Sequence, residues 1–282
     1  MLSLIFKAEI GGMGESEREV EHLLWQRIIS ALVGIPLIIW ASYAGGYWFK
    51  VGVGIIILFG LYEYGNMMRK RGYGTFLYSG YLSGILIIGS AWTRGFIPDG
   101  IYFLIFLLHV LPVVCGRTSI ENMIFSFAGV FLVAWTLSHL ILIREEFPQG
   151  FNYILLCFII TWTTDTGAYF SGRFFGRHKL SPIISPNKTV EGAIGGTFLC
   201  VLIVLLLNIL FLNIPVYILV ILAFLSSIAG QAGDLLESAV KRWAGVKDSG
   251  KVIPGHGGIL DRFDSLMLVA PLVYNFLNLL IR

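Results

Sequence analysis

The sequence predicts an all-α, polytopic integral membrane protein with about nine transmembrane helices. Its 282 residues are 56% hydrophobic and only 13% charged, and the mean hydropathy is +0.81. Ordinary soluble domains contain roughly a quarter charged residues. One core of this size could not bury so much apolar surface, so most of that surface must face lipid. These values argue against a soluble enzyme.

Stretches free of Asp, Glu, Lys and Arg mark the expected spans, because about 20 apolar residues cross a bilayer as a helix. Six such stretches are 28–49, 72–93, 100–116, 122–143, 147–164 and 265–281. A seventh span, 51–68, is interrupted only by Glu63. The stretch 192–233 has 42 residues, and one helix of that length would be about 63 Å long, twice the hydrocarbon thickness. A turn at Asn213-Ile214-Pro215 divides it, which brings the total to nine spans.

The spans divide the chain into three expected parts. They are a cytoplasmic segment 1–27, five helices within 28–150, and a catalytic region 151–282 of about four helices with two long cytoplasmic loops, 172–189 and 234–264. The first part has neither a signal-peptide nor a transit-peptide pattern, and Met13 is an alternative start.

Positive charge predicts the orientation, because Lys and Arg accumulate in cytoplasmic loops. An odd number of spans puts the two termini on opposite sides of the membrane. With the N-terminus inside, sixteen of the 20 Lys and Arg residues face the cytoplasm. The four on the outside are Lys50, Arg94, Arg144 and Arg282. We therefore expect both long loops, and the chemistry they carry, to face the cytoplasm.

Two other kinds of site find no support in the sequence. The net charge of +3, with no long basic run, does not indicate a nucleic-acid partner. Cys115, Cys157 and Cys200 stand far apart without metal-ligand spacing, so neither a disulfide framework nor a zinc site is expected.

The loop 234–264 is unusually rich in polar groups. Asp261 and Asp264 are spaced i, i+3, so on a helix both carboxylates share one face and can bind a divalent cation. Asp234, at the inner end of the eighth span, is a candidate third ligand. The glycines of Pro254-Gly-His-Gly-Gly258 let backbone amides approach a phosphate group.

The second loop combines basic residues with glycine and serine, as a site for anions does. Arg173 and Lys188 are candidate phosphate ligands, since guanidinium and ammonium groups bind phosphate in different ways. Thr189 is expected to cap a helix whose N-terminus also favours anions. Asp165, late in the sixth span, is either a further acidic ligand or a hydrogen-bonding partner of this loop.

For any single charge, a solvated loop residue is the simpler interpretation. That interpretation weakens for acids that adjoin apolar spans, where an ionised group costs about 2.5 to 3.5 kcal/mol or more and generally has a function. Glu63, in contrast, is interpreted as a structural polar residue near the inner face.

The segment from Ser238 to Asp264 resembles the signature of one enzyme family, the integral-membrane phosphatidate cytidylyltransferases. The matching residues are Ser238, Val240, Lys241-Arg242, Lys247-Asp248, Gly250, Ile253, Pro254, His256-Gly257-Gly258, Ile259 and Asp261-Arg262-Phe263-Asp264. The block 165–196 is also similar to the family, whereas the first ~150 residues resemble it only as hydrophobic spans.

This resemblance implies the transfer of CMP from CTP to phosphatidate, giving CDP-diacylglycerol and pyrophosphate, in the bacterial inner membrane. It implies Mg²⁺ as cofactor, with room for a second cation. The implied metal ligands are Asp234, Asp261 and Asp264, with Asp165 and Asp248 as further candidates. Lys241, Arg242 and His256 are implied in catalysis, and the implied substrate-binding residues are Lys188, Lys247, Arg262, Gly257, Gly258, Ser238 and Arg173. A homodimer is compatible with the sequence, which indicates no interface for it.

Three alternatives stay open from the residues. Intramembrane acids also occur in ion-coupled transporters, although here they collect at the inner ends of spans rather than at midpoints. A CDP-alcohol phosphatidyltransferase would need an Asp-Gly-x-x-Ala-Arg block, which the sequence lacks. A CTP-dependent lipid kinase shares the substrate chemistry, and only the fate of the nucleotide separates it from a cytidylyltransferase.

Overall fold

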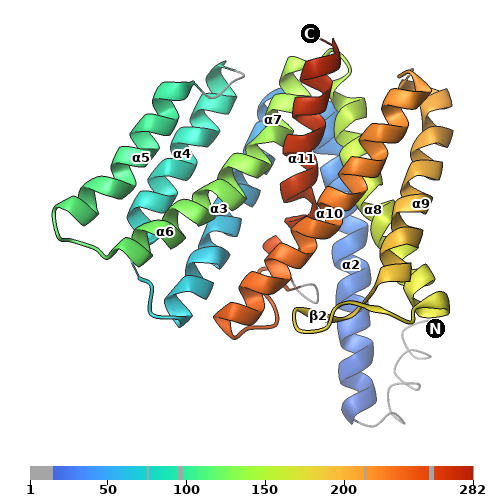
Figure 1. Cartoon of the computed structure of the whole chain (residues 1–282), viewed down its shortest axis with the longest axis horizontal. Coiled ribbons are helices and arrows are strands. Elements are labelled where there is room, and N and C mark those ends of the chain that lie inside the picture. The colour runs from blue at the N-terminus through green and yellow to red at the C-terminus, as the bar shows by residue number, and fades with distance from the viewer. Residues whose placement is uncertain (1–14, 75, 95–97, 213, 254–256, 282) are drawn as a thin grey trace, which may run out of the picture.

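The computed structural model describes residues 15–74, 76–94, 98–212, 214–253 and 257–281 (Figure 1). The helices are α2 (Glu15–Ala44), α3 (Gly46–Lys70), α4 (Phe76–Arg94), α5 (Asp99–Val114), α6 (Ile120–Gly129), the π-helical turn η1 (Val130–Trp135), α7 (Thr136–Glu146), α8 (Gly150–Phe175), α9 (Val190–Leu207), the π-helical turn η2 (Asn208–Leu212), α10 (Val216–Ala244) and α11 (Leu260–Ile281). A single antiparallel hairpin, β1 (Lys179–Ser181) with β2 (Ser185–Thr189), is the sheet formed by these residues. The predicted all-α class is confirmed.

Each predicted span lies largely within a helical segment of the described chain. The helices α6, η1 and α7 run on as one rod, Ile120–Glu146, as do α9 and most of η2. Among the residues that the structure describes, five segments are long and apolar enough to cross a membrane by length and composition: Gly46–Lys70, Ile120–Glu146, Val190–Leu210, Val216–Ala244 and Leu260–Leu280. A polytopic membrane protein is therefore supported, and Asn213 of the predicted turn lies outside the described residues.

Several helix ends differ from the ends of the charge-free stretches. The first two spans separate at Gly45, which has φ +62°, and not at Lys50. Lys50 instead lies within α3, where its Nζ is 2.9 Å from Glu145. The helices α8 and α10 continue past the apolar stretch, so the inner loops shorten to 176–189 and 245–259. Charge marks where a helix leaves lipid, whereas the helix ends only where its capping geometry is met.

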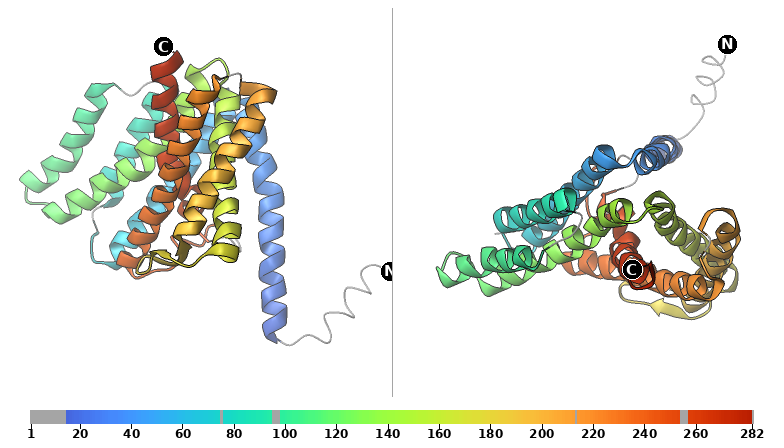
Figure 2. Two further views of the ribbon diagram at one scale, coloured as in Figure 1. Left: turned by 45° about the vertical axis from the view of Figure 1, so that its right-hand side comes forward. Right: turned by 90° about the horizontal axis from the view of Figure 1, so that it is seen from above.

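The helices form an elongated bundle whose two ends differ (Figures 1 and 2). In Figure 1, α2 begins at the lower end and α11 finishes at the upper end, with the hairpin at the lower end. The central helices α3, α7 and α11 pack against one another, with Leu61, Ile141 and Val273 fully buried. Both long loops that are predicted to be cytoplasmic, the hairpin and the α10–α11 connection, lie toward the lower end in Figure 1.

The close packing of α8 on α9 positions the hairpin. Gly192 and Gly196 repeat at an interval of four along α9, a spacing that allows two helix backbones to approach closely. A Cβ atom on Gly196 would lie 2.6 Å from the carbonyl oxygen of Thr164 on α8. Because side chains are excluded from this contact, the segment immediately before α9 is held against the lower part of α8.

A polar junction ties α8, α9 and α10 together. The Thr164 hydroxyl donates to Ser227 at 2.9 Å, and Ser227 in turn donates to Thr197 at 3.1 Å. Gln231 Nε2 donates to the Thr197 hydroxyl at 3.0 Å. Such contacts between membrane helices contribute about 0.6 kcal/mol each on average. The junction orients α10 immediately before the turn that carries Asp234.

Candidate active site at the junction of two cavities

The first cavity, which we call the hairpin cavity, lies between α8, α10 and the hairpin and has a volume of about 550 Å³. Its cationic side chains are Arg173 from α8 and Lys188 from β2. Its acidic side chains are Asp165 from α8 and Asp234 from α10. A cavity of this size lies in the range that holds a nucleotide-sized molecule.

Lys188 is fixed in this cavity by its neighbours. Its Nζ forms an ion pair with Asp234, and both side chains are 28% exposed. The predicted cap is confirmed, since the Thr189 hydroxyl accepts a hydrogen bond from Gly192 N at 3.1 Å. Glu191 accepts from the backbone of Arg177 at 3.0 Å, which closes the hairpin over the start of α9. The cation therefore stands beside a helix N-terminus, where both favour an anion.

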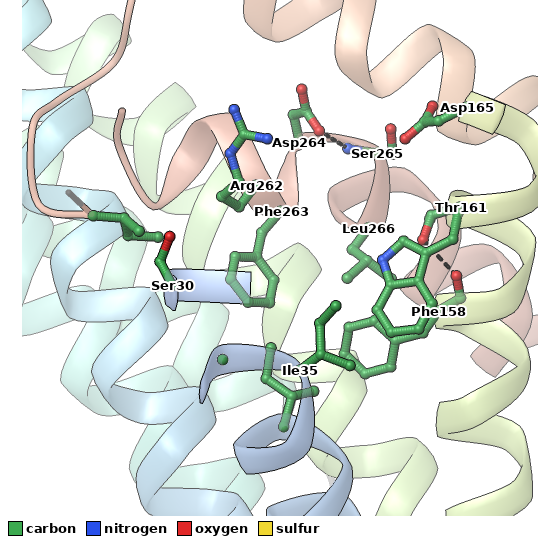
Figure 3. A pocket seen from close by; sticks show the side chains of 14 residues that line it. Ser30, Ile35, Phe158, Thr161, Asp165, Arg262, Phe263, Asp264, Ser265 and Leu266 are labelled. Atoms are coloured by element: carbon green, nitrogen blue, oxygen red, sulfur yellow. Dashed lines mark hydrogen bonds between the residues drawn. The ribbon is translucent and has the colours of Figure 1, made fainter. Parts of the chain in front are cut away.

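The second cavity, which we call the α2 cavity, lies between α2, α8 and α11 and has a volume of about 250 Å³. Figure 3 shows Asp165, Arg262 and Asp264 at one end of it. The opposite end is lined by apolar side chains such as Ile35 and Phe158. This division suits a molecule with a charged head and an apolar body.

Asp165 lines both cavities, so the two adjoin at this residue. Asp165 lies within electrostatic range of Asp234, Lys188 and Arg262. Asp264 is within range of Asp234 and Asp165. A Cβ atom on Gly233 would lie 2.6 Å from the backbone oxygen of Asp264, so the missing side chain lets α11 approach α10 at this level. Three helices thus bring one acid each to the junction.

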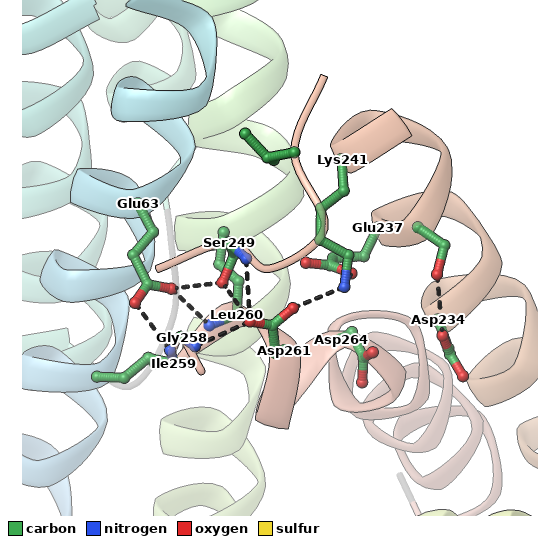
Figure 4. A network of polar contacts seen from close by, with 12 residues as sticks. Glu63, Asp234, Glu237, Lys241, Ser249, Gly258, Ile259, Leu260, Asp261 and Asp264 are labelled. Carbon is green, nitrogen blue, oxygen red and sulfur yellow. Dashed lines mark hydrogen bonds and ion pairs between the residues drawn. The ribbon is translucent and has the colours of Figure 1, made fainter. Parts of the chain in front are cut away.

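A buried ion-pair cluster lies next to this junction (Figure 4). Lys241 Nζ is 2.5 Å from a Glu237 oxygen and 2.6 Å from Asp261 Oδ1. The three side chains are 11%, 2% and 7% exposed, in the order Lys241, Glu237, Asp261. Removing one partner from such a buried arrangement generally costs several kcal/mol, because it leaves an uncompensated charge.

Asp261 is engaged on both of its oxygens. Oδ2 accepts hydrogen bonds from Gly258 N at 2.8 Å and from Ser249 N at 3.0 Å, while Oδ1 faces Lys241. In this arrangement both oxygens of Asp261 already have partners within the protein. A buried ammonium group needs a counter-ion, and Asp261 supplies it, whereas Asp264 lines the α2 cavity.

Within the described ranges, no three acidic, histidine or cysteine side chains stand in an arrangement that would hold a metal ion as they are placed. The metal ligands, including Asp261 and the exposed Asp248, stay predictions. The carboxylates that line the two cavities are those of Asp165, Asp234 and Asp264.

The other predicted site residues lie at varying distances from the cavities. Ser238 is buried, and its hydroxyl donates to Asp234 Oδ1 at 3.4 Å. Arg173 donates to the Tyr169 hydroxyl at 2.8 Å in the wall of the hairpin cavity. Arg242 donates to the carbonyl of Val246 at 3.0 Å, and it lines neither cavity.

The remaining predicted residues belong to the connection between α10 and α11. Lys247 is exposed and lines neither cavity. Gly257 has φ +84°, a conformation that favours glycine, and Gly258 is buried. His256 lies outside the described residues.

Sequence reasoning missed the roles of Glu63 and Glu237. Glu63 is 1% exposed and accepts a hydrogen bond from Ser249, 186 positions along the chain. Glu237 pairs with Lys241. For Glu63 the available signal was an acidic residue inside an apolar span, which is unusual enough to indicate function.

The chain is similar in sequence to known proteins. A family model described as the cytidylyltransferase family matches residues 25–280. A phosphatidate cytidylyltransferase of Staphylococcus saprophyticus subsp. saprophyticus is 56% identical over 131 residues, which are 46% of this chain and 50% of that protein. The protein of the same name from Staphylococcus haemolyticus is 55% identical over 127 residues, 44% of this chain and 48% of that protein. The matched part thus spans about half the length of these curated relatives.

Proposed function

This chain belongs to the cytidylyltransferase family, and we propose that it transfers CMP from CTP to phosphatidate, giving CDP-diacylglycerol and pyrophosphate. Relatives named phosphatidate cytidylyltransferase support the choice of substrates. The single structural observation that carries the proposal is the meeting of two cavities at Asp165, with Lys188 in one and Arg262 in the other. A reaction between two anionic substrates needs such a pair of cationic sites side by side.

In the proposed reaction, a phosphate oxygen of phosphatidate attacks the α-phosphorus of CTP. The new bond is P–O–P, the α–β bond of CTP breaks, and pyrophosphate leaves with the electron pair. A phosphate monoester has a second pKa near 6, so the nucleophile is largely dianionic at pH 7 and needs no general base. The energetic difficulty is charge repulsion between the two reactants, which cationic side chains and fixed positions reduce.

The described side chains have the chemistry for these tasks. Lys188 and Arg173 would bind phosphate oxygens in the hairpin cavity, and Arg262 would bind them in the α2 cavity. The apolar end of the α2 cavity would exclude water and accommodate the lipid beside the phosphate. Asp165 at the boundary would keep the two cationic groups apart and oriented.

Asp165, Asp234 and Asp264 would hold Mg²⁺ at the junction. Carboxylate oxygens are the ligands that Mg²⁺ prefers, and these three line the cavities that also contain Lys188 and Arg262. As placed they do not form a metal-binding cluster, so they would have to approach one another to hold the ion. When bound, the ion would supply positive charge at the phosphoryl group being transferred. The remaining predicted ligands, Asp261 and Asp248, would be available to bind a second cation.

We place the enzyme in the bacterial plasma membrane with this junction facing the cytoplasm, where CTP is available. The charge asymmetry of the loops and the bacterial relatives support this location. A homodimer stays a prediction.

The test is incubation of the purified protein with phosphatidate and CTP carrying a label either on cytidine or on the γ-phosphate. We expect the cytidine label in the lipid product, the γ-label in pyrophosphate, and loss of both after EDTA, with recovery on adding Mg²⁺. A γ-label in the lipid would instead identify a CTP-dependent lipid kinase. If neither label appears in lipid or in pyrophosphate, both the cytidylyltransferase and the lipid kinase are contradicted. Activity that persists in EDTA would contradict the need for Mg²⁺.

A further inference from the structure

Glu63 is a buried acid that the proposed chemistry does not use. It lies on α3, in the half of the chain that resembles the family only as hydrophobic spans, and its side chain is 1% exposed. An acidic side chain in a membrane helix is costly unless its oxygens are hydrogen-bonded. The hydrogen bonds of Glu63 all lead to one place, the start of α11 and the turn before it (Figure 4).

Two of these hydrogen bonds come from the first backbone amides of α11. Ile259 N donates to Glu63 Oε1 at 2.9 Å, and Leu260 N donates to Oε2 at 2.9 Å. Amides at the start of a helix have no acceptor within that helix and carry partial positive charge. The carboxylate of Glu63 therefore caps α11 from a different helix and fixes where α11 begins.

The third contact links Glu63 to the buried ion-pair cluster. The Ser249 hydroxyl lies 2.9 Å from Glu63 Oε2 and 3.0 Å from Asp261 Oδ2, and it donates to one of them at a time. Asp261 continues the chain of contacts to Lys241. Glu63 therefore contacts the α10–α11 connection at Ser249 and the start of α11 directly, and it is linked to Lys241 on α10 through Ser249 and Asp261.

Two glycines of the signature make room for this carboxylate. A Cβ atom on Gly250 would lie 2.3 Å from Glu63 Oε1, and one on Gly258 would lie 2.5 Å from Oε2. The expectation for Gly258 is that it admits a phosphate group. That prediction is untested, but a Cβ atom at Gly258 would also lie 2.0 Å from the Ser249 hydroxyl. This protein contact accounts for the need for glycine at both positions.

We propose that Glu63 is a positioning residue for the proposed cytidylyltransferase reaction, setting the start of α11 so that Arg262 and Asp264 project into the α2 cavity. Both follow Leu260 within about one helical turn, so a displacement of the first turn carries directly to them. This inference rests on the proposed function. A misplacement of about 1 Å in a catalytic group can lower turnover about a hundredfold.

The central experiment compares Glu63→Gln with the wild type in full-length purified protein. Glutamine has the same size but presents an NH₂ group where one oxygen now faces a backbone N–H, so one hydrogen bond is replaced by a clash of donors. We expect kcat per folded molecule to fall about ten- to a hundredfold, with KM for both substrates changed less than about threefold. Glu63→Asp, which keeps the carboxylate, should recover part of kcat.

Glu145→Gln is the matched control. Glu145, on α7, forms an ion pair with Lys50 of α3. Lys50 lies about 20 Å from Glu63 along the axis of α3. The control should keep the wild-type kcat. A Glu63→Gln enzyme with unchanged kcat, or no recovery in Glu63→Asp, would overturn the proposal.

A second pair of variants covers the case in which Glu63→Gln does not fold. Gly250→Ala adds one methyl group whose nearest neighbours are all atoms of Glu63, so it should displace the carboxylate and lower kcat. In the background of Glu63→Ala the same methyl group should have no further effect. Equal losses in both backgrounds would overturn the proposal. A wild-type protein without CMP transfer would refute the proposed function itself, which keeps the two failures distinct.

Discussion

Among single residues, two aspartates one turn apart on α11 have different surroundings. Asp261 is 7% exposed on its side chain, pairs with Lys241 and accepts backbone hydrogen bonds from Gly258 and Ser249. Asp264 lines the α2 cavity, and its Oδ1 accepts a hydrogen bond from the amide of the next residue, Ser265 N, at 2.7 Å. Asp261 thus contacts other protein groups, whereas Asp264 faces a cavity.

We therefore expect opposite consequences from Asp261→Asn and Asp264→Asn. Asp261→Asn should lower the free energy of unfolding by about 3–5 kcal/mol, because Lys241 keeps only Glu237 and a buried charged partner is lost. Asp264→Asn should leave stability unchanged or slightly raised, since it removes one of several like charges, while activity falls at least about a hundredfold.

Thermal unfolding in detergent and CMP transfer, measured on the same samples, check both expectations. Near-normal turnover in Asp264→Asn would remove that carboxylate from the site. An unchanged melting temperature in Asp261→Asn would show that its ion pair with Lys241 contributes no stability.

Among elements, the contact between α8 and α9 determines where the cationic hairpin lies. The helices approach through glycines, so that Thr189 and Lys188 stand directly beside α8. A Cβ atom on Gly172, for example, would be 3.0 Å from the Thr189 hydroxyl. Local sequence determines that α8 and α9 are helices, but the short distance between these two helices determines whether Lys188 reaches Asp234.

Gly196→Ala tests this contact. The new methyl group would lie 2.6 Å from the Thr164 carbonyl, so the helices must separate, at a cost of about 1–3 kcal/mol. The variant should unfold at a lower temperature and show a higher KM for CTP. Gly89→Ala, on α4, is the control, because nothing lies within 4 Å of the added atom. Equal stability of the two variants would contradict the close packing of α8 and α9.

For the whole molecule, the two ends of the bundle have different chemistry. The hairpin and the α10–α11 connection lie toward the lower end in Figure 1, while α11 finishes at the upper end. The ends of the described helices agree with an odd number of crossings. Orientation in the membrane, however, follows from the charges of the loops and not from the arrangement of the helices.

Cysteine labelling tests the orientation. In a Cys115→Ser background, which removes the exposed native thiol, Lys251→Cys and Gln149→Cys each place one thiol at an exposed position. A membrane-impermeant maleimide should label Gln149→Cys in intact cells and Lys251→Cys only in inverted vesicles. The reverse pattern would put the proposed site on the side without CTP.

Hydropathy and charge predicted the helices and the all-α class because the free energy of moving a residue into lipid depends mainly on that residue and its near neighbours in sequence. The signature from Ser238 to Asp264 likewise indicated the family from local residues, and the Thr189 cap followed from residue type. Other features depend on contacts between distant segments. Ser249 meets Glu63 across 186 positions, Lys188 meets Asp234 across two helices, and Asp165 joins two cavities. Only packing could assign these, because a buried carboxylate takes its role from the donors that the fold brings to it, and those donors are not its neighbours in the chain.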